Sequence, residues 1–409
     1  MAGAACLEAD VVVLGGGPAG SALALNLAPF RRVLVVDKRA RTGSRVGESL
    51  PAAALRLLRD MQLEQDFLQQ AHLPCPVSRS TWGGSDLLEQ DAIRNLDGPG
   101  WHLDRDRFDA WLLGAARERG AAVLTETRLA GARRLEGGAG WRLALERAGR
   151  PLQVAAPFVV DATGRNSLFA RQAGARRAAL DKLVCGWLFG TDRTDAGGVS
   201  ELHAEAEGWW YTAPLPGRRR LLAFYTDADL PSAPAAYDGA GLRQRAHGIA
   251  GLAEVLEEHG FAAGTEHGFC AANSVVLAPA CGPGWLAVGD AALSFDPLSS
   301  QGLFHALYTG LAGAEAVQRH LLGGLDGQGA LPGYQAELDR IRDAYAAHLD
   351  AWYGQETRWP DAPFWQRRRA GAFGRADTLS AAPASPSLRP PRPGATAARS
   401  ASPARRDPG

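Results

Sequence analysis

Residues 10–37 read DVVVLGGGPAGSALALNLAPFRRVLVVD, and this stretch decides the fold. An apolar run ends in a Gly-rich turn, a helical pattern extends from about Pro18 to Ala28, and a second apolar run ends at Asp37. This order predicts a strand, a helix and a second strand, with the helix joining two parallel strands. The expected consequence is a parallel sheet with helices on its faces.

The Gly-rich turn has the spacing G-x-G-x-x-G and contains Gly15, Gly17, Pro18, Ala19 and Gly20. Between a strand and a helix, such a turn lets the backbone approach a pyrophosphate at the helix N-terminus. Asp37 closes the second strand, where a carboxylate can accept hydrogen bonds from the hydroxyls of an adenosine ribose. Three close glycines can also simply form a tight turn, but the strand, helix and acid together predict a dinucleotide site.

Composition and charge exclude several classes of function. The 409 residues include 44 Lys+Arg and 44 Asp+Glu, so a formal net charge of zero provides no long-range attraction for nucleic acid. No stretch approaches the roughly 18 apolar residues that cross a bilayer, and Glu8 and Asp10 replace the basic start of a signal peptide. The five cysteines are scattered singly, and no paired His has metal-ligand spacing. We expect a cytoplasmic protein with no membrane span, no nucleic-acid partner and no metal site.

The remaining pattern divides the chain into two domains and a tail. Short runs rich in Trp, Tyr and Val predict a mostly β domain inserted into the first one. The final segment is rich in Pro, Ala and Ser and has no aromatic residue, so we expect it to be disordered, with an electrostatic tether as the alternative. The other expected elements are a helix over Leu50–Gln70, a helix over Arg107–Arg119, strands over 120–160 with a hairpin turn at Gly137–Gly140, a strand over Trp285–Gly289 and a helix over Ser300–Leu322.

Four motifs together resemble the FAD-dependent monooxygenases of the aromatic-hydroxylase type, whose fold is shared by flavin-dependent halogenases and geranylgeranyl reductases. They occur in the family's order over about residues 8–320: Gly15–Gly20 with Asp37, Arg45–Pro51 (RVGESLP), Asp161–Arg165 (DATGR) and Gly289–Gly302 (GDAALSFDPLSSQG). The resemblance implies a mixed α/β fold, a Rossmann-like FAD-binding domain with an inserted β-sheet substrate domain. The implied boundaries are 1–179 and 277–330 for the FAD-binding domain, 180–276 for the substrate domain, 331–375 for a C-terminal helical segment and 376–409 for the disordered tail.

The resemblance also implies that FAD is bound non-covalently by these motifs. Asp290 would contact the ribityl or pyrophosphate portion, and the helix start after Pro297 would place backbone N–H groups beside the flavin pyrimidine. Asp161 is either a second nucleotide contact or a cap of its own loop, and Glu48 is either a helix-dipole partner or a flavin-side residue. The residues expected to bind the cofactor are Gly15, Gly17, Pro18, Ala19, Gly20, Asp37, Arg45, Arg105, Asp161, Gly164, Gly289, Asp290, Pro297, Gly302 and Leu303.

The sequence favours hydroxylation over halogenation. A halogenase of this family would carry a Trp-x-Trp-x-Ile-Pro segment and a lysine after Gly-Glu-Ser, whereas this chain has GWWYTAPLP over 208–216 and no lysine over 63–97. A hydroxylase mainly needs a dry, oriented pocket, because the flavin carries the chemistry. Aromatic residues in strands either form the core or line such a pocket. We expect Trp210, Tyr211 and Gln301 on the substrate side, and no catalytic side chain is identified.

Within the family, the chain looks most similar to flavoprotein maturases that help to form cysteine tryptophylquinone in oxidases. The segments 208–211, 295–302 and 356–365 carry this similarity. The implied reaction is hydroxylation of a tryptophan side chain in a partner protein, with NADH or NADPH as the reductant. Four alternatives remain: a hydroxylase of a small aromatic natural product, a halogenase, an isoprenoid reductase, and a flavin-binding partner protein without turnover.

Overall fold

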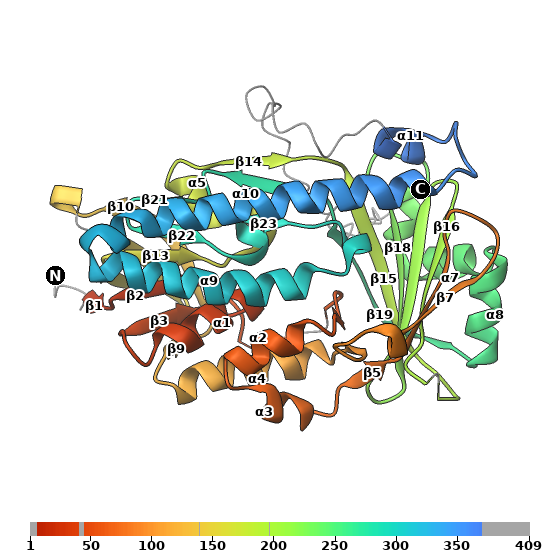
Figure 1. Cartoon of the computed structure of the whole chain (residues 1–409), viewed down its shortest axis with the longest axis horizontal. Helices are drawn as coiled ribbons and strands as arrows, with labels where there is room; N and C mark the ends of the chain where they lie inside the picture. Colours follow the sequence, from red (N-terminus) through yellow and green to blue (C-terminus); the bar gives the residue numbers. More distant parts are fainter. Residues whose placement is uncertain (1–5, 41–44, 139, 196, 370–409) are drawn as a thin grey trace, which may run out of the picture.

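The computed structural model describes residues 6–40, 45–138, 140–195 and 197–369. A six-stranded sheet occupies one end of the molecule and a seven-stranded sheet the other (Figure 1). The segment predicted as a disordered tail, 376–409, lies outside the described residues. None of the helices in the described ranges is both long and apolar enough to cross a membrane.

The six-stranded sheet contains the predicted strand–helix–strand unit, with α1 (Pro18–Leu27) joining β2 to its parallel neighbour β3. All its neighbouring strands are parallel except β21, which is antiparallel to β22. This confirms the predicted mixed α/β fold class. The strands, in spatial order, are β21 (Cys281–Gly282), β22 (Trp285–Ala287), β13 (Phe158–Asp161), β2 (Val11–Leu14), β3 (Val33–Val36) and β9 (Ala122–Leu124).

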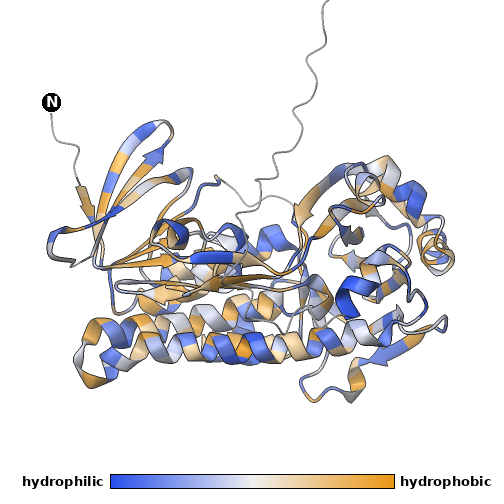
Figure 2. Cartoon of the chain, turned by 90° about the horizontal axis from the view of Figure 1, so that it is seen from above, coloured by the Kyte–Doolittle hydropathy of each residue, from blue (hydrophilic) through white to orange (hydrophobic). Residues whose placement is uncertain are grey.

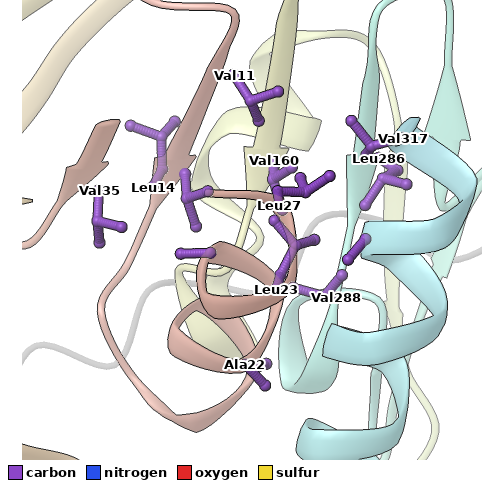
Figure 3. Close-up of a cluster of buried hydrophobic side chains, with 14 of the residues drawn as sticks. Val11, Leu14, Ala22, Leu23, Leu27, Val35, Val160, Leu286, Val288 and Val317 are labelled. Carbon is purple, nitrogen blue, oxygen red and sulfur yellow. The ribbon is translucent and has the colours of Figure 1, made fainter. Parts of the chain in front are cut away.

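The core of this domain lies between the parallel sheet and two helices. Figure 3 shows Leu23 and Leu27 of α1 pointing among side chains of the sheet and of α9 (Gly302–Leu322). A Cβ at Gly310 of α9 would lie 2.7 Å from the carbonyl oxygen of Ala19, so only glycine lets the two helices approach this closely. The helix α10 (Gly324–Gln355) runs alongside α9, and α4 (Arg105–Glu118) packs against α1 (Figure 1).

The seven-stranded sheet covers more of the chain than the predicted insert. Two of its strands, β6 and β7, precede residue 180, and one of its faces is covered by α6 (Ala233–Ala236), α7 (Gly239–Ala246) and α8 (Ala250–Glu258). The domain boundaries therefore stay a prediction. The strands, in spatial order, are β19 (Ala262–Ala271), β15 (Leu183–Thr191), β18 (Arg219–Asp227), β17 (Gly208–Leu215), β16 (Ser200–Glu205), β6 (Val77–Thr81) and β7 (Leu88–Asp91).

Smaller sheets and helices complete the molecule. A four-stranded sheet contains the predicted hairpin, and its strands are β1 (Cys6–Glu8), β12 (Arg150–Ala156), β11 (Trp141–Arg147) and β10 (Thr127–Arg134). Figure 2 shows that the surface helices carry hydrophilic as well as hydrophobic residues. The other elements are β4 (Ser49–Leu50), β8 (Gly100–His102), β5 (Leu73–Cys75), β14 (Arg176–Ala179), β20 (Val275–Ala278), β23 (Leu293–Ser294), α5 (Leu168–Gln172) and α11 (Pro363–Arg369).

One predicted helix is wrong. The segment Leu50–Gln70 is not a single helix but a short strand followed by α2 (Ala54–Asp60) and α3 (Glu64–Leu68). The break occurs at Gln62, whose φ of +57° is left-handed and cannot continue a helix. The apolar spacing is the same in two short helices as in one long helix, so periodicity alone missed the break.

Candidate functional site

The Gly-rich turn after β2 leaves open space at the N-terminus of α1. Gly15 has a φ of +114°, and a Cβ there would overlap the carbonyl of Ala162, while a Cβ at Gly20 would overlap the carbonyl of Gly15. These two positions therefore require glycine. A Cβ at Gly17, by contrast, would meet no atom of the described residues within 4 Å. Pro18 and Ala19 form the buried first turn behind it, so the helix N-terminus faces a space that suits a phosphate.

Asp37 lies beside this turn and is engaged by two groups. Its Oδ2 accepts a hydrogen bond of 2.8 Å from the Gly16 N–H, and its Oδ1 accepts one of 3.1 Å from Nε of Arg39. Burial alone would raise the pKa of Asp37, but these hydrogen bonds hold it below its ordinary value. Nη1 of Arg39 is buried and has no hydrogen-bond partner in the described part of the chain. A buried donor without an acceptor fits a ligand oxygen such as a ribose hydroxyl.

The Asp161 carboxylate accepts hydrogen bonds from the residues that follow it in the chain. Its Oδ1 accepts hydrogen bonds from the N–H and Oγ1 of Thr163 at 2.9 and 2.6 Å, and its Oδ2 accepts one of 2.8 Å from the Ala170 N–H. The carboxylate is fully buried, and burial raises its pKa. Of the two interpretations of this motif, the structure thus supports the loop cap for the Asp161 side chain. Gly164, with a φ of +74°, borders open space and stays a candidate contact.

Asp290 is placed differently, in the short turn Gly289–Ala291 after β22, and is partly open to solvent. Its side chain is 38% exposed, and its Oδ2 lies 3.5 Å from Nε of Arg165. The preceding Gly289 packs against Ala19 of α1, where a Cβ would come within 2.8 Å. The ends of β2, β13 and β22 therefore meet beside α1, at the edge where open α/β sheets bind their ligands. The pairing partner Arg165 closes the motif Asp161–Arg165, but the sequence analysis did not include it among the cofactor-binding residues.

The loop Asp296–Gln301 leads into α9. Asp296 accepts a hydrogen bond of 2.9 Å from the Leu298 N–H through Oδ1, which shapes the short turn that begins at Pro297. Gln301 and Gly302 are exposed, a Cβ at Gly302 would meet no described atom within 4 Å, and Leu303 is buried beneath them. The first N–H groups of a helix have no partner within it, so this open helix start suits an anionic or hydrogen-bond-accepting group.

Arg45 and Arg105 are brought together by a residue that the sequence analysis did not single out. Both guanidinium groups pair with the buried carboxylate of Asp109 on α4, at 3.3 Å from Arg45 and 3.1 Å from Arg105. Arg105 also donates a hydrogen bond of 2.7 Å to the Gly47 carbonyl. A pocket at this position is lined by both arginines, Leu103 and Arg219. Arg45 keeps more exposed surface than Arg105, so it is the freer donor of the two.

The aromatic segment of β17 splits between the two faces of the seven-stranded sheet. Tyr211 lies on the face toward the FAD-binding domain, with its hydroxyl near the Glu48 carboxylate, and burial raises the pKa of both groups. Trp210 lies on the other face, fully buried beneath α7, with its ring stacked on Phe224 at 4.7 Å between centroids. The structure therefore does not bring Trp210 to the side predicted for the substrate, because neighbouring residues of a strand point to opposite faces. Glu48 precedes strand β4 and caps no helix.

Comparisons with known proteins agree with this geometry. The family described as "FAD binding domain" matches residues 8–307. A putative FAD-dependent oxidoreductase, LodB of Marinomonas mediterranea, is 29% identical over 88% of this chain and 97% of its own length. The halogenase CndH has a TM-score of 0.80 at 24% identity over 88% of this chain and 86% of its own, which shows the fold alone.

A further solved structure is more informative because its sequence is also similar. The peptidyl tryptophan dihydroxylase QhpG has a TM-score of 0.70 at 27% identity, over 88% of this chain and 79% of its own. The family match spans most of the chain, and the open helix starts, the required glycines and the unpartnered Arg39 nitrogen fit a bound dinucleotide. The chain therefore belongs to the FAD binding domain family and is an FAD-dependent oxidoreductase.

Proposed function

We propose that the protein is a monooxygenase that hydroxylates an aromatic ring, and that this ring is a tryptophan side chain of a partner protein. Two relatives support the proposal. One is named a peptidyl tryptophan dihydroxylase essential for tryptophylquinone cofactor biogenesis, and the other is a putative oxidoreductase that matches nearly end to end. The reductant, NADH or NADPH, stays a prediction.

The positions of the lysines favour hydroxylation over halogenation. The whole chain contains two, Lys38 and Lys182. The side chain of Lys182 is 63% exposed and pairs with Asp229 at 2.7 Å, and Lys38 is exposed just after β3 in the FAD-binding domain. Neither accompanies Tyr211 on the face toward the FAD-binding domain. A halogenase that carries its hypohalous species on a lysine amine has no such amine here, although the fold resembles that of CndH.

The residues of this chain would hold and orient the reactants. When bound, FAD supplies the redox and oxygen chemistry. The N-terminus of α1 would bind the pyrophosphate, Asp37 and Arg39 the adenosine ribose, and the N-terminus of α9 would stabilise negative charge on the flavin pyrimidine. Glu48 and Tyr211 form a buried polar pair beside the stacked rings of Trp209 and Tyr225, and we propose that this pair orients the indole N–H.

Mass spectrometry of a co-expressed quinoprotein precursor tests the function. We expect oxygen to be added to a precursor tryptophan with the wild type and not with Asp290→Ala, which should lose FAD. Chloride or bromide should make no difference. A tryptophan without added oxygen, or a halogenated one, would contradict the proposal. Stimulated NADH or NADPH oxidation by small aromatics alone would favour the natural-product hydroxylase, saturation of a prenyl chain the reductase, and binding without oxygen transfer the partner protein.

A further inference from the structure

A helix beyond the family match, α10, reaches the loop that leads into α9. The match ends at residue 307, whereas α10 and α11 follow it. From α10, the hydroxyl of Tyr353 donates a hydrogen bond of 2.7 Å to Oδ2 of Asp296, and the hydroxyl of Tyr345 accepts one of 2.7 Å from the Asp296 N–H. A single loop residue is therefore held through both its side chain and its backbone by one helix.

Tyr353 connects the loop to the seven-stranded sheet, and Tyr345 packs against the residues next to the loop. The Tyr353 hydroxyl accepts a hydrogen bond of 3.2 Å from Nε1 of Trp209 on β17, and both side chains are almost fully buried. The Tyr345 ring stacks on Phe295 with 4.3 Å between centroids, and its hydroxyl lies 2.8 Å from Oγ of Ser274. Each of these polar groups is buried and paired, which makes the arrangement costly to disturb.

The end of α10 is in turn fixed by α11. Arg368 forms a buried ion pair of 2.8 Å with Asp227 of β18, and its guanidinium lies over the rings of Phe364 and Tyr353 at 3.6 and 5.1 Å. Removing one partner of a buried ion pair is strongly destabilising, so α11 has a defined seat on the sheet. Tyr353 is therefore held in place by Trp209 of β17 and by Arg368 of α11.

We infer that Tyr353 and Tyr345 are positioning residues for the flavin: they hold Asp296, and through it the loop Asp296–Gln301 and the first turn of α9, in the geometry that meets the cofactor. The inference rests on the proposal that this loop faces the flavin, but it is independent of the substrate. The charged groups near Asp296 are Asp181, which disfavours its ionised form, and Arg368, which favours it. Leu298 and Tyr353 donate hydrogen bonds to its carboxylate, so the loop geometry and the Asp296 charge depend on each other.

The test compares Tyr353→Phe and Tyr345→Phe with a matched control, Tyr334→Phe. Tyr334 lies on the same helix, is equally buried, and donates a hydrogen bond of 2.8 Å to the Ala287 carbonyl rather than to the loop. For Tyr353→Phe we expect the FAD Kd to rise about tenfold, because a hydrogen bond to a charged group is lost. The visible flavin spectrum should change. The midpoint of its pH titration, which reports the Asp296 carboxylate near pH 6, should move to higher pH because this carboxylate loses a hydrogen-bond donor. Tyr334→Phe should lower the Tm without these changes.

The outcomes separate the inference from the proposal beneath it. If the double variant Tyr345→Phe/Tyr353→Phe keeps the wild-type Kd, spectrum and titration and loses only stability, as the control does, the tyrosines are merely structural. If Asp296→Asn alters the flavin and the tyrosine variants do not, the loop faces the cofactor but the inference fails. If Asp296→Asn also leaves the flavin unchanged, the loop does not meet the cofactor and both are overturned.

Discussion

The two ends of the proposed FAD site are built on different principles. At the turn after β2, backbone atoms close in sequence make the site: Gly15 and Gly20 are required by contacts within residues 15–20 and to one neighbouring strand. At the loop Asp296–Gln301, the shape depends on Tyr345 and Tyr353, which come about 50 residues later. A short sequence motif is therefore enough to predict the turn after β2. The shape of the loop Asp296–Gln301 instead depends on how α10 folds back across the molecule.

The largest expected effect comes from the glycines of the first end. In Gly20→Ala the new methyl group would overlap the Gly15 carbonyl, which is backbone and cannot yield, so we expect loss of FAD binding and of most folded protein. Gly17→Ala is the matched control, because Gly17 has an ordinary φ of −78° and open space around it. It should keep its Tm and lose FAD affinity, since the methyl group points into the proposed phosphate space. Equal Tm losses in the two variants would show that this space is not open. Circular dichroism and flavin titration measure both effects.

The two aspartates at the strand ends sharpen the comparison next. Asp161 is buried with three hydrogen bonds, whereas Asp290 is partly exposed with one distant ion pair. We expect Asp161→Ala to cost about 3 kcal/mol of unfolding free energy, since it orphans buried donors. Asp290→Ala should leave the stability of the FAD-free protein nearly unchanged and sharply reduce FAD retention. Urea unfolding of the FAD-free proteins, with flavin content of the purified ones, distinguishes these effects. The opposite assignment would mean that Asp161 is the ligand contact.

The pH dependence tests the second end. Burial, together with Asp181, raises the pKa of Asp296 to about 6 from an ordinary value near 3.8. Because the folded protein binds this proton more tightly than the unfolded chain, the contribution of Asp296 to stability is fully present below about pH 4 and is lost as pH rises through 6. Wild type and Asp296→Asn should differ in this window, by roughly 2–3 kcal/mol between pH 4 and 8. Parallel stability curves in urea would contradict the raised pKa.

Sequence patterns predicted the features encoded by neighbouring residues and missed the contacts between residues that are far apart in the chain. The strand–helix–strand unit, the required glycines and the hairpin formed by β10 and β11 are each encoded within a few residues. Asp109 stands four residues after Arg105 on α4, a spacing that pairs opposite charges on a helix, but its second partner, Arg45, lies in another segment and could not be assigned to it from sequence. Arg39 stands two positions after Asp37, and an Arg so close to the acid of a dinucleotide motif was the one signal that could have drawn attention to it.

The smallest effect concerns the two faces of β17. A period of two residues says that Trp210 and Tyr211 point to opposite sides, but not which side meets the substrate. The structure puts Trp210 beneath α7 and Tyr211 beside Glu48. Trp210→Phe should therefore cost about 1–2 kcal/mol of stability by leaving a cavity, with kcat and KM unchanged. Tyr211→Phe should cost a similar amount of stability, because the buried Glu48 carboxylate loses a polar neighbour. It should also lower kcat/KM several-fold, because the pair that orients the indole is broken. Steady-state kinetics on the tryptophan substrate beside urea unfolding measures both. If Trp210→Phe changes KM and Tyr211→Phe does not, the substrate binds the opposite face and the proposed pocket is misplaced.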